Sequence, residues 1–182
     1  MKKLLLMLSF VFLFAGCTLG KDMMNTPTKK VEEFLGKYQT LDDDVLKDLD
    51  GIVKEDESFN SEQRQRYTKI FKKHYESLKY DIKDEIMNGD KATVEVEIEV
   101  TDYSKILAAA ESYMNANPDE FKDENGIHST SKFIDYQLDQ LENAKDSIVY
   151  TLSLTLSKVD DEWKLDPLTD IQEQKIHGVY VY

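Results

Sequence analysis

Asp84 is the carboxylate whose surroundings in the sequence could alter its chemistry. Strict alternation along residues 80–86 would place Asp84 on the same strand face as Tyr80 and Ile86. Burial among apolar side chains raises the pKa of a carboxylate, which could then act as a base beside a phenol donor from Tyr80 or Tyr150. The alternative, which we favour, is a charge that stops an edge strand from pairing with another sheet.

His74 is the histidine that the sequence places nearest to an apolar core. It falls on the apolar stripe of a helix predicted over residues 61–78. We expect a core or rim histidine held by one hydrogen bond, and a pocket acid or base is the alternative. His128 and His177 lie in or near predicted loops, and the sequence identifies no partner for either.

A partial match to a calcium-binding loop runs through Asp48, Asp50, Gly51 and Glu57. The first position of that loop would be Leu46, which offers no oxygen ligand. The same stretch carries a helical apolar stripe, and a helix cannot also wrap around a cation. We therefore predict no metal site here, and no catalytic triad, phosphate loop or cofactor motif is apparent elsewhere.

The charge and the cysteine count exclude several classes of protein. The 182 residues include 23 basic and 36 acidic side chains, for a net charge of -13. Such a chain repels phosphate backbones and anionic lipid headgroups, so we expect neither nucleic-acid binding nor electrostatic membrane adhesion. Cys17 is the single cysteine, so the exported part has no disulfide and no cysteine for a structural zinc site.

The chain begins with the pattern of an export signal. Two lysines precede an apolar run over residues 4–14, which is too short to span a bilayer. The run leads into Ala15, Gly16 and Cys17, which resemble the lipobox of bacterial lipoproteins, with Phe14 where leucine is usual. The resemblance implies that the Cys17 thiol is diacylglycerated and that the chain is cut just before it. An ordinary signal peptide with an incidental cysteine is the alternative.

Lipid on Cys17 would hold the mature protein at the cell membrane, on its extracytoplasmic face. Each methylene buried in the bilayer contributes about 0.8 kcal/mol, and two acyl chains anchor far better than one. Residues 1–16 are then the signal peptide, 17–27 the lipidated cysteine with a polar tether, and 28–182 one exported domain. Abundant Lys, Asn and Ile, with a short leader, indicate a Gram-positive bacterium.

Helical periodicity predicts six helices in the exported domain, over residues 28–38, 42–54, 61–78, 104–115, 132–143 and 168–177. Thr26 or Thr28 is the expected N-cap of the first helix, and Ser61 that of the third. The stretch over residues 117–131 is polar and is expected to be a loop.

Alternation of apolar and polar residues predicts two antiparallel hairpins. The first covers residues 80–101, and one face of its second strand bears Glu95, Glu97 and Glu99. The second covers residues 148–165 and turns at two aspartates. Helices, hairpin, helices and hairpin in that order predict an α+β domain, in which N-terminal helices pack on a curved antiparallel sheet.

This order of elements resembles the nuclear transport factor 2-like family, a cystatin-like α+β cone. The late segment YTLSLTLSKVDDEWKLDP, residues 150–167, completes a resemblance that covers most of residues 28–170. It implies a sheet curled around a helix, often with a pocket, while the helical insert over residues 103–144 departs from the compact pattern and leaves the shape of the pocket mouth open. The pocket candidates are His74, Tyr80, Asp84 and Tyr150.

The expected function is that of a surface-anchored, non-enzymatic domain that binds a small apolar molecule, a peptide or another envelope protein. The resemblance also implies an alternative, an isomerase or hydratase of the ketosteroid-isomerase type with Asp84 as the base. That alternative requires Asp84 to be buried beside a cavity. An assembly role is a third candidate, although like charge disfavours a dimer through the acidic strand face.

Overall fold

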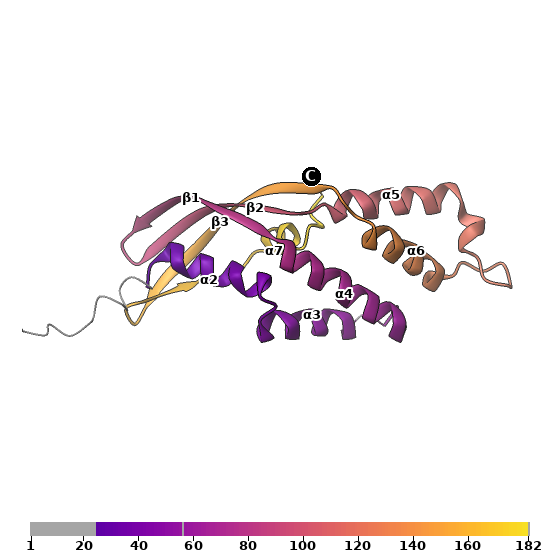
Figure 1. The fold of residues 1–182 in the computed structure, drawn as a ribbon, viewed down its shortest axis with the longest axis horizontal. Helices are drawn as coiled ribbons and strands as arrows, with labels where there is room; N and C mark the ends of the chain where they lie inside the picture. Colours follow the sequence, from indigo (N-terminus) through magenta and orange to yellow (C-terminus); the bar gives the residue numbers. More distant parts are fainter. Residues whose placement is uncertain (1–24, 56, 182) are drawn as a thin grey trace, which may run out of the picture.

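The fold is an elongated α+β structure, known here from a computed structural model that describes residues 25–55 and 57–181. Figure 1 shows the sheet and one helix at one end of the long axis, with most of the remaining helices at the other. Cys17 and the leader lie outside the described residues. No helix in the described part of the chain is long and apolar enough to cross a membrane.

All six predicted helices are present, and each end lies within two residues of the predicted one. They are α2 (Pro27–Gln39), α3 (Asp43–Glu55), α4 (Ser61–Ser77), α5 (Tyr103–Ala116), α6 (Thr130–Glu142) and α7 (Asp170–Ile176). Thr26 caps α2 by accepting a hydrogen bond from the Lys29 nitrogen at 3.2 Å. The N-cap of α4 is Asn60 rather than Ser61, because Asn60 and Gln63 form a reciprocal capping box.

The two predicted hairpins form one antiparallel sheet in the order β1-β2-β3-β4. Its strands are β1 (Lys79–Asn88), β2 (Lys91–Thr101), β3 (Ser147–Val159) and β4 (Glu162–Leu165). The turn between β3 and β4 uses positive φ at Asp160 and Asp161, 53° and 62°, as a type I′ hairpin turn requires. The Lys158 nitrogen donates to the Asp90 carbonyl at 2.8 Å, which places both hairpin turns at the same end of the sheet.

Two apolar cores follow each other along the molecule. In the first, α2 lies against one face of the sheet, and the interior between them is filled by side chains that are at most 2% exposed, among them Val31, Leu35, Val94, Val96, Ile98, Leu152 and Leu154. In the second, α3, α4, α5 and α6 pack on one another through residues such as Leu49, Phe71, Tyr75, Ile134 and Leu138. The helical insert therefore packs with α3 and α4 in a core separate from that of the sheet.

A β-bulge in β1 overturns the alternation predicted for residues 80–86. Ile82 pairs with Val96, but Asp84 pairs with Glu95, so Lys83 is an extra residue in the ladder. Every side chain after the bulge changes face. Ile86 is consequently 62% exposed, and Glu85 turns inward toward α2.

The polar stretch over residues 117–131 is more ordered than predicted. It contains a short 3₁₀ helix, η1 (Pro118–Phe121). The Phe121 ring is only 3% exposed, and it packs against rings from both helices of the insert. Phe121 thus closes the outer end of the α5–α6 pair.

The start of the described chain is fixed to the second hairpin. The Asn25 amide nitrogen donates to the Asp161 carbonyl at 2.8 Å, and its amide oxygen accepts from the Trp163 nitrogen at 2.9 Å. One side chain therefore joins the segment before α2 to the turn between β3 and β4.

Candidate functional site

A cavity of about 260 Å³ lies where the two cores meet. Four elements border it: the second half of α4, the end of β2, the start of α5 and the end of α6. Its lining residues are Lys69, Ile70, Lys73, His74, Ser77, Thr101, Tyr103, Leu141, Glu142 and Ala144. Its volume is close to that of small-molecule sites, which begin at about 300 Å³.

His74 is the buried polar residue of this cavity, with a relative exposure of 1%. Its Nε2 lies 2.9 Å from the Ile176 carbonyl oxygen. Because a carbonyl only accepts, Nε2 carries the hydrogen and Nδ1 presents a lone pair. Burial lowers the pKa of His74 to about 4, so the ring is neutral at physiological pH.

The lone pair on His74 Nδ1 accepts no hydrogen bond from a described residue. Nδ1 is a buried side-chain nitrogen without a hydrogen-bond partner among the described residues. A buried acceptor that lost its water costs about 1–3 kcal/mol unless a donor replaces it. His74 therefore belongs to the cavity wall and carries a buried acceptor that no described residue satisfies.

The His74 ring is packed between two neighbours. The Tyr103 ring lies at a centroid distance of 4.9 Å from it. On another side Gly178, with φ of 70°, approaches so closely that a Cβ would meet the Thr101 carbonyl oxygen at 2.1 Å and His74 Cε1 at 3.0 Å. The Gly178 carbonyl in turn accepts from the nitrogens of Tyr103 and Ser104, both at 2.9 Å. The acceptor is thus preorganised.

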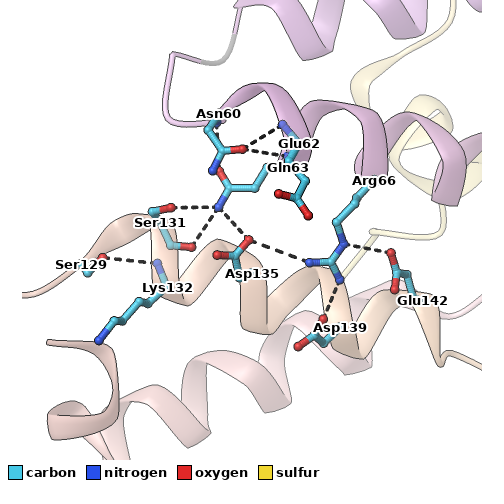
Figure 2. Close-up of polar contacts among 10 residues, drawn as sticks. All are labelled: Asn60, Glu62, Gln63, Arg66, Ser129, Ser131, Lys132, Asp135, Asp139 and Glu142. Carbon is cyan, nitrogen blue, oxygen red and sulfur yellow. Dashed lines mark hydrogen bonds and ion pairs between the residues drawn. The ribbon is translucent and has the colours of Figure 1, made fainter. Parts of the chain in front are cut away.

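Hydrogen bonds and ion pairs join α4 to α6 at the border of the cavity (Figure 2). Gln63 is fully buried, and its Nε2 lies within 3.0 Å of three oxygens of Ser131 and Asp135. One helical turn later, Arg66 binds Asp139 at 2.6 Å and Glu142 at 3.0 Å, and these acids keep its pKa above the ordinary value. Figure 2 shows both side chains of α4 reaching across to α6.

No family model, curated protein or solved structure matches the chain.

The four pocket candidates do not lie together in the structure. Asp84 is exposed, so the isomerase-type base loses the burial that it requires. Tyr80 and Tyr150 do lie in one row of the sheet, with Ile98 between them, but neither lines the His74 cavity. Tyr150 is buried and donates to the Tyr180 carbonyl at 3.3 Å. Of the four, only His74 lines this cavity, while Tyr80 borders a separate hollow of about 180 Å³ on the sheet.

His177 has a partner that the sequence did not identify. Its Nδ1 lies 2.9 Å from the hydroxyl of Tyr75, and burial lowers its pKa. Tyr75 precedes His177 by 102 residues, so no local pattern could have paired them. The Tyr75–His177 pair packs beside His74 and joins α4 to the end of α7.

The described residues include no group of three or more His, Cys, Asp or Glu side chains placed to hold a metal ion. Asp48, Asp50 and Gly51, from the partial calcium motif, are part of the helix α3, as predicted. The cavity instead combines a neutral imidazole, an aromatic ring and ammonium groups. That combination is suited to holding a small polar molecule by hydrogen bonds and charge.

Proposed function

We propose that this chain is a lipid-anchored extracytoplasmic binding protein whose ligand site is the His74 cavity. The observation that carries the binding role is the cavity of about 260 Å³ at the junction of the two cores, which the buried His74 and the exposed Lys69 and Lys73 line. The anchor rests on the sequence: residues 1–16 are removed, and Cys17 carries the lipid at the membrane of a Gram-positive bacterium.

Binding explains the site better than catalysis does. A histidine with a pKa near 4 is a weak base and holds no proton to donate from Nδ1 at neutral pH. Asp84, the carboxylate on which the isomerase alternative depends, faces solvent. The cavity therefore offers recognition groups without a matched acid and base, and we assign it no reaction.

For the domain we propose a variant of the nuclear transport factor 2-like cone. Two features support this: α2 lies against the buried face of a four-stranded antiparallel sheet, and both hairpins flank a helical insert. Side chains such as Val31, Leu35 and Ile98, all 0% exposed, fill the space between α2 and the sheet. In this proposal the ligand site has moved to the junction with the insert.

The anchor is tested by Cys17→Ala expressed in the native host. We expect the variant to take up no radiolabelled fatty acid and to be released from the membrane fraction, because no other cysteine can form the thioether. Thr18→Ala, one residue away, is the control and should remain acylated. Acyl labelling that persists in Cys17→Ala would refute the anchor.

The binding role is tested by a thermal-shift screen of the full chain, in detergent, against neutral and charged small metabolites. Hits are then examined through the ring nitrogen resonances of ¹⁵N-labelled histidine, of which the chain has only three. A true ligand raises the melting temperature and shifts the His74 Nδ1 resonance. Stabilisation without any change at His74 would place the ligand elsewhere and refute the proposed site.

A further inference from the structure

A second cleft, of about 420 Å³, is lined by the hydrogen-bonded pair Tyr75 and His177. It lies between α3, the end of α2 and α7, and it shares no lining residue with the His74 cavity. Its volume falls within the usual range of small-molecule sites, about 300–1,000 Å³. The cleft is therefore a candidate binding site that is independent of the His74 cavity.

The charge of this cleft is acidic and is not compensated by ion pairs. Three carboxylates line it, those of Asp48, Glu55 and Glu173, against the single ammonium of Lys47. None of these four side chains forms an ion pair with another described residue. Electrostatically, the cleft therefore favours a cation.

The cleft also offers an uncharged polar group that a ligand can reach, the hydroxyl of Tyr38. Tyr38 is half-buried, and its hydroxyl is open to solvent and forms no hydrogen bond with a described residue. Burial, and after it the carboxylates of Glu173 and Asp48, raise the pKa of Tyr38 to about 12, so both acids act on this hydroxyl. The hydroxyl keeps its proton at neutral pH, and its oxygen can accept a hydrogen bond from an ammonium.

One face of α3 carries an acid, an apolar side chain and a second acid in turn along the cleft. Asp48, Ile52 and Glu55 are spaced by four and three residues, so they lie in one stripe of the helix. Ile52 is 48% exposed, while Leu49 and Val53 of the same helix are buried. The two acids are about 10 Å apart along the helix axis, at about 1.5 Å per residue. Such a stripe is complementary to a molecule in which methylenes separate two ammoniums.

Gly51 lines the same cleft from the middle of α3. A Cβ at this position would meet no atom within 4 Å, so packing does not require a glycine here. Glycine inside a helix is less stable than almost any other residue. The missing side chain leaves the cleft open beside Asp48 and Ile52, which gives the glycine a role in binding.

The acids of the cleft are spread out rather than gathered around one point. Among the described residues, Asp48, Glu173 and His177 are not placed to hold one metal ion. The cleft therefore suits a cation that is long enough to reach several groups.

We propose that this cleft binds a linear aliphatic polyamine. Its ammoniums pair with Asp48, Glu55 and Glu173, and its methylenes lie against Ile52. The hydroxyl of Tyr38 accepts a hydrogen bond from one ammonium. This site is additional to the proposed His74 cavity, and neither requires the other.

The probes are amines titrated into the full chain, in detergent, by calorimetry. Spermidine should bind about tenfold more tightly than butylamine, because it forms two further ion pairs, each with about a threefold effect. Putrescine should bind more tightly than Mg²⁺, which carries the same charge without methylenes. Raising the salt concentration should weaken spermidine binding, because partly exposed ion pairs are screened. Bound spermidine should shift the ¹⁵N ring resonances of His177, which lines the cleft, and not those of His74.

The variants test charge and shape separately. Asp48→Asn and Glu173→Gln should each weaken spermidine about three- to fivefold, in keeping with exposed ion pairs. Asp50→Asn is the control, since it makes the same charge change on α3 but Asp50 lines a separate groove between α3 and α4. Gly51→Leu should weaken spermidine about tenfold or more, because the added side chain occupies the cleft. Leucine favours a helix more than glycine does, so thermal unfolding should show this variant to be at least as stable as wild type.

Four results would overturn the inference. Equal weakening by Asp48→Asn and Asp50→Asn would show a diffuse attraction of amines to an acidic protein. Equal affinity for spermidine and butylamine, or for putrescine and Mg²⁺, would show that the spacing of the ammoniums is not recognised. Unchanged binding to a stable Gly51→Leu variant would place the amine outside the cleft.

The fourth result is a shift at His74 in place of His177, which would put the amine in the other cavity. A failure of the His74 site alone, in which no small molecule shifts His74, would leave the polyamine site standing. The ring resonances of the two histidines therefore distinguish the failure of one proposal from the failure of the other.

Discussion

Glu85 Oε2 accepts two hydrogen bonds from Thr28, one from its backbone nitrogen at 2.9 Å and one from its hydroxyl at 2.6 Å. Thr28 lies in the first turn of α2, where free N–H groups and the helix dipole favour a negative charge. The bulge at Lys83 is what turns Glu85 to this side of the sheet. One extra residue in β1 thus fixes the helix that covers the first core.

Glu85→Ala should lower the free energy of unfolding by about 1–2 kcal/mol, because the start of α2 loses the oxygen that accepts two of its hydrogen bonds. Urea unfolding of the full chain measures the change. Glu95→Ala is the control: Glu95 is exposed on β2 opposite Asp84, and its loss should change stability by no more than about 0.5 kcal/mol. Equal losses in the two variants would mean that the contact with Thr28 contributes nothing.

Most of the fold could be predicted because the spacing of apolar residues and the residue types found in turns are properties of short segments. The six helices and both hairpins follow from spacings within single segments. The bulge could not be predicted, because the sequence around Lys83 alternates without a break and the register is set by pairing with β2 and by the Thr28 contact. A one-residue shift there reversed the predicted faces of Asp84 and Ile86.

Gln63→Ala should be among the most destabilising polar substitutions, by about 2–3 kcal/mol. Its amide oxygen accepts from the Asn60 nitrogen in the capping box, while its amide nitrogen reaches Ser131 and Asp135 on α6. Removal deletes these hydrogen bonds and the packing of a side chain that is itself fully buried. Gln65→Ala, at an exposed position on the same helix, is the matched control and should be nearly neutral in urea unfolding.

Gly178→Ala should destabilise the protein by about 3 kcal/mol or more, since a Cβ would collide with the Thr101 carbonyl at a positive φ. It should also shift the ring resonances of His74, which the same Cβ would touch. Gly36→Ala, within α2 and with open space around its Cβ, should instead stabilise by about 1 kcal/mol. Thermal unfolding of the two variants in opposite directions would check both expectations.

Acid should destabilise the protein in part through His74. The folded state holds the His74 pKa near 4, whereas the unfolded chain takes up a proton near 6.5. The associated stability is therefore fully present above pH 6.5 and is lost as the pH falls toward 4, a difference of roughly 3 kcal/mol at most. His177, whose pKa burial also lowers, acts in the same direction.

The measurement is the free energy of unfolding from pH 4 to pH 7.5 for wild type and His74→Gln. We expect the variant to be less stable at neutral pH but to show a shallower pH dependence, since glutamine does not titrate. His128→Gln, at an exposed position, should keep the wild-type slope. If His74→Gln kept that slope too, the carboxylates and His177 alone would account for the acid sensitivity.

The candidate site was only partly visible in the sequence. The apolar stripe of α4 correctly predicted a buried His74 with one hydrogen bond. Its cavity depends on contacts with Gly178, Tyr103 and the end of α6, which lie far along the chain and carry no local signal. Arg66 and its three acidic neighbours on α6 are invisible for the same reason, because ordinary surface charges give no sign of their partners.

The Asn25 bridge to the second hairpin has a geometric consequence for a chain anchored at Cys17. Eight peptide units separate Cys17 from residue 25, which the bridge fixes to the sheet. At about 3.5 Å per extended residue, eight units span at most about 28 Å. The hairpin turns would therefore stay close to the bilayer. The helical insert, at the opposite end of the molecule, would extend into the envelope (Figure 1).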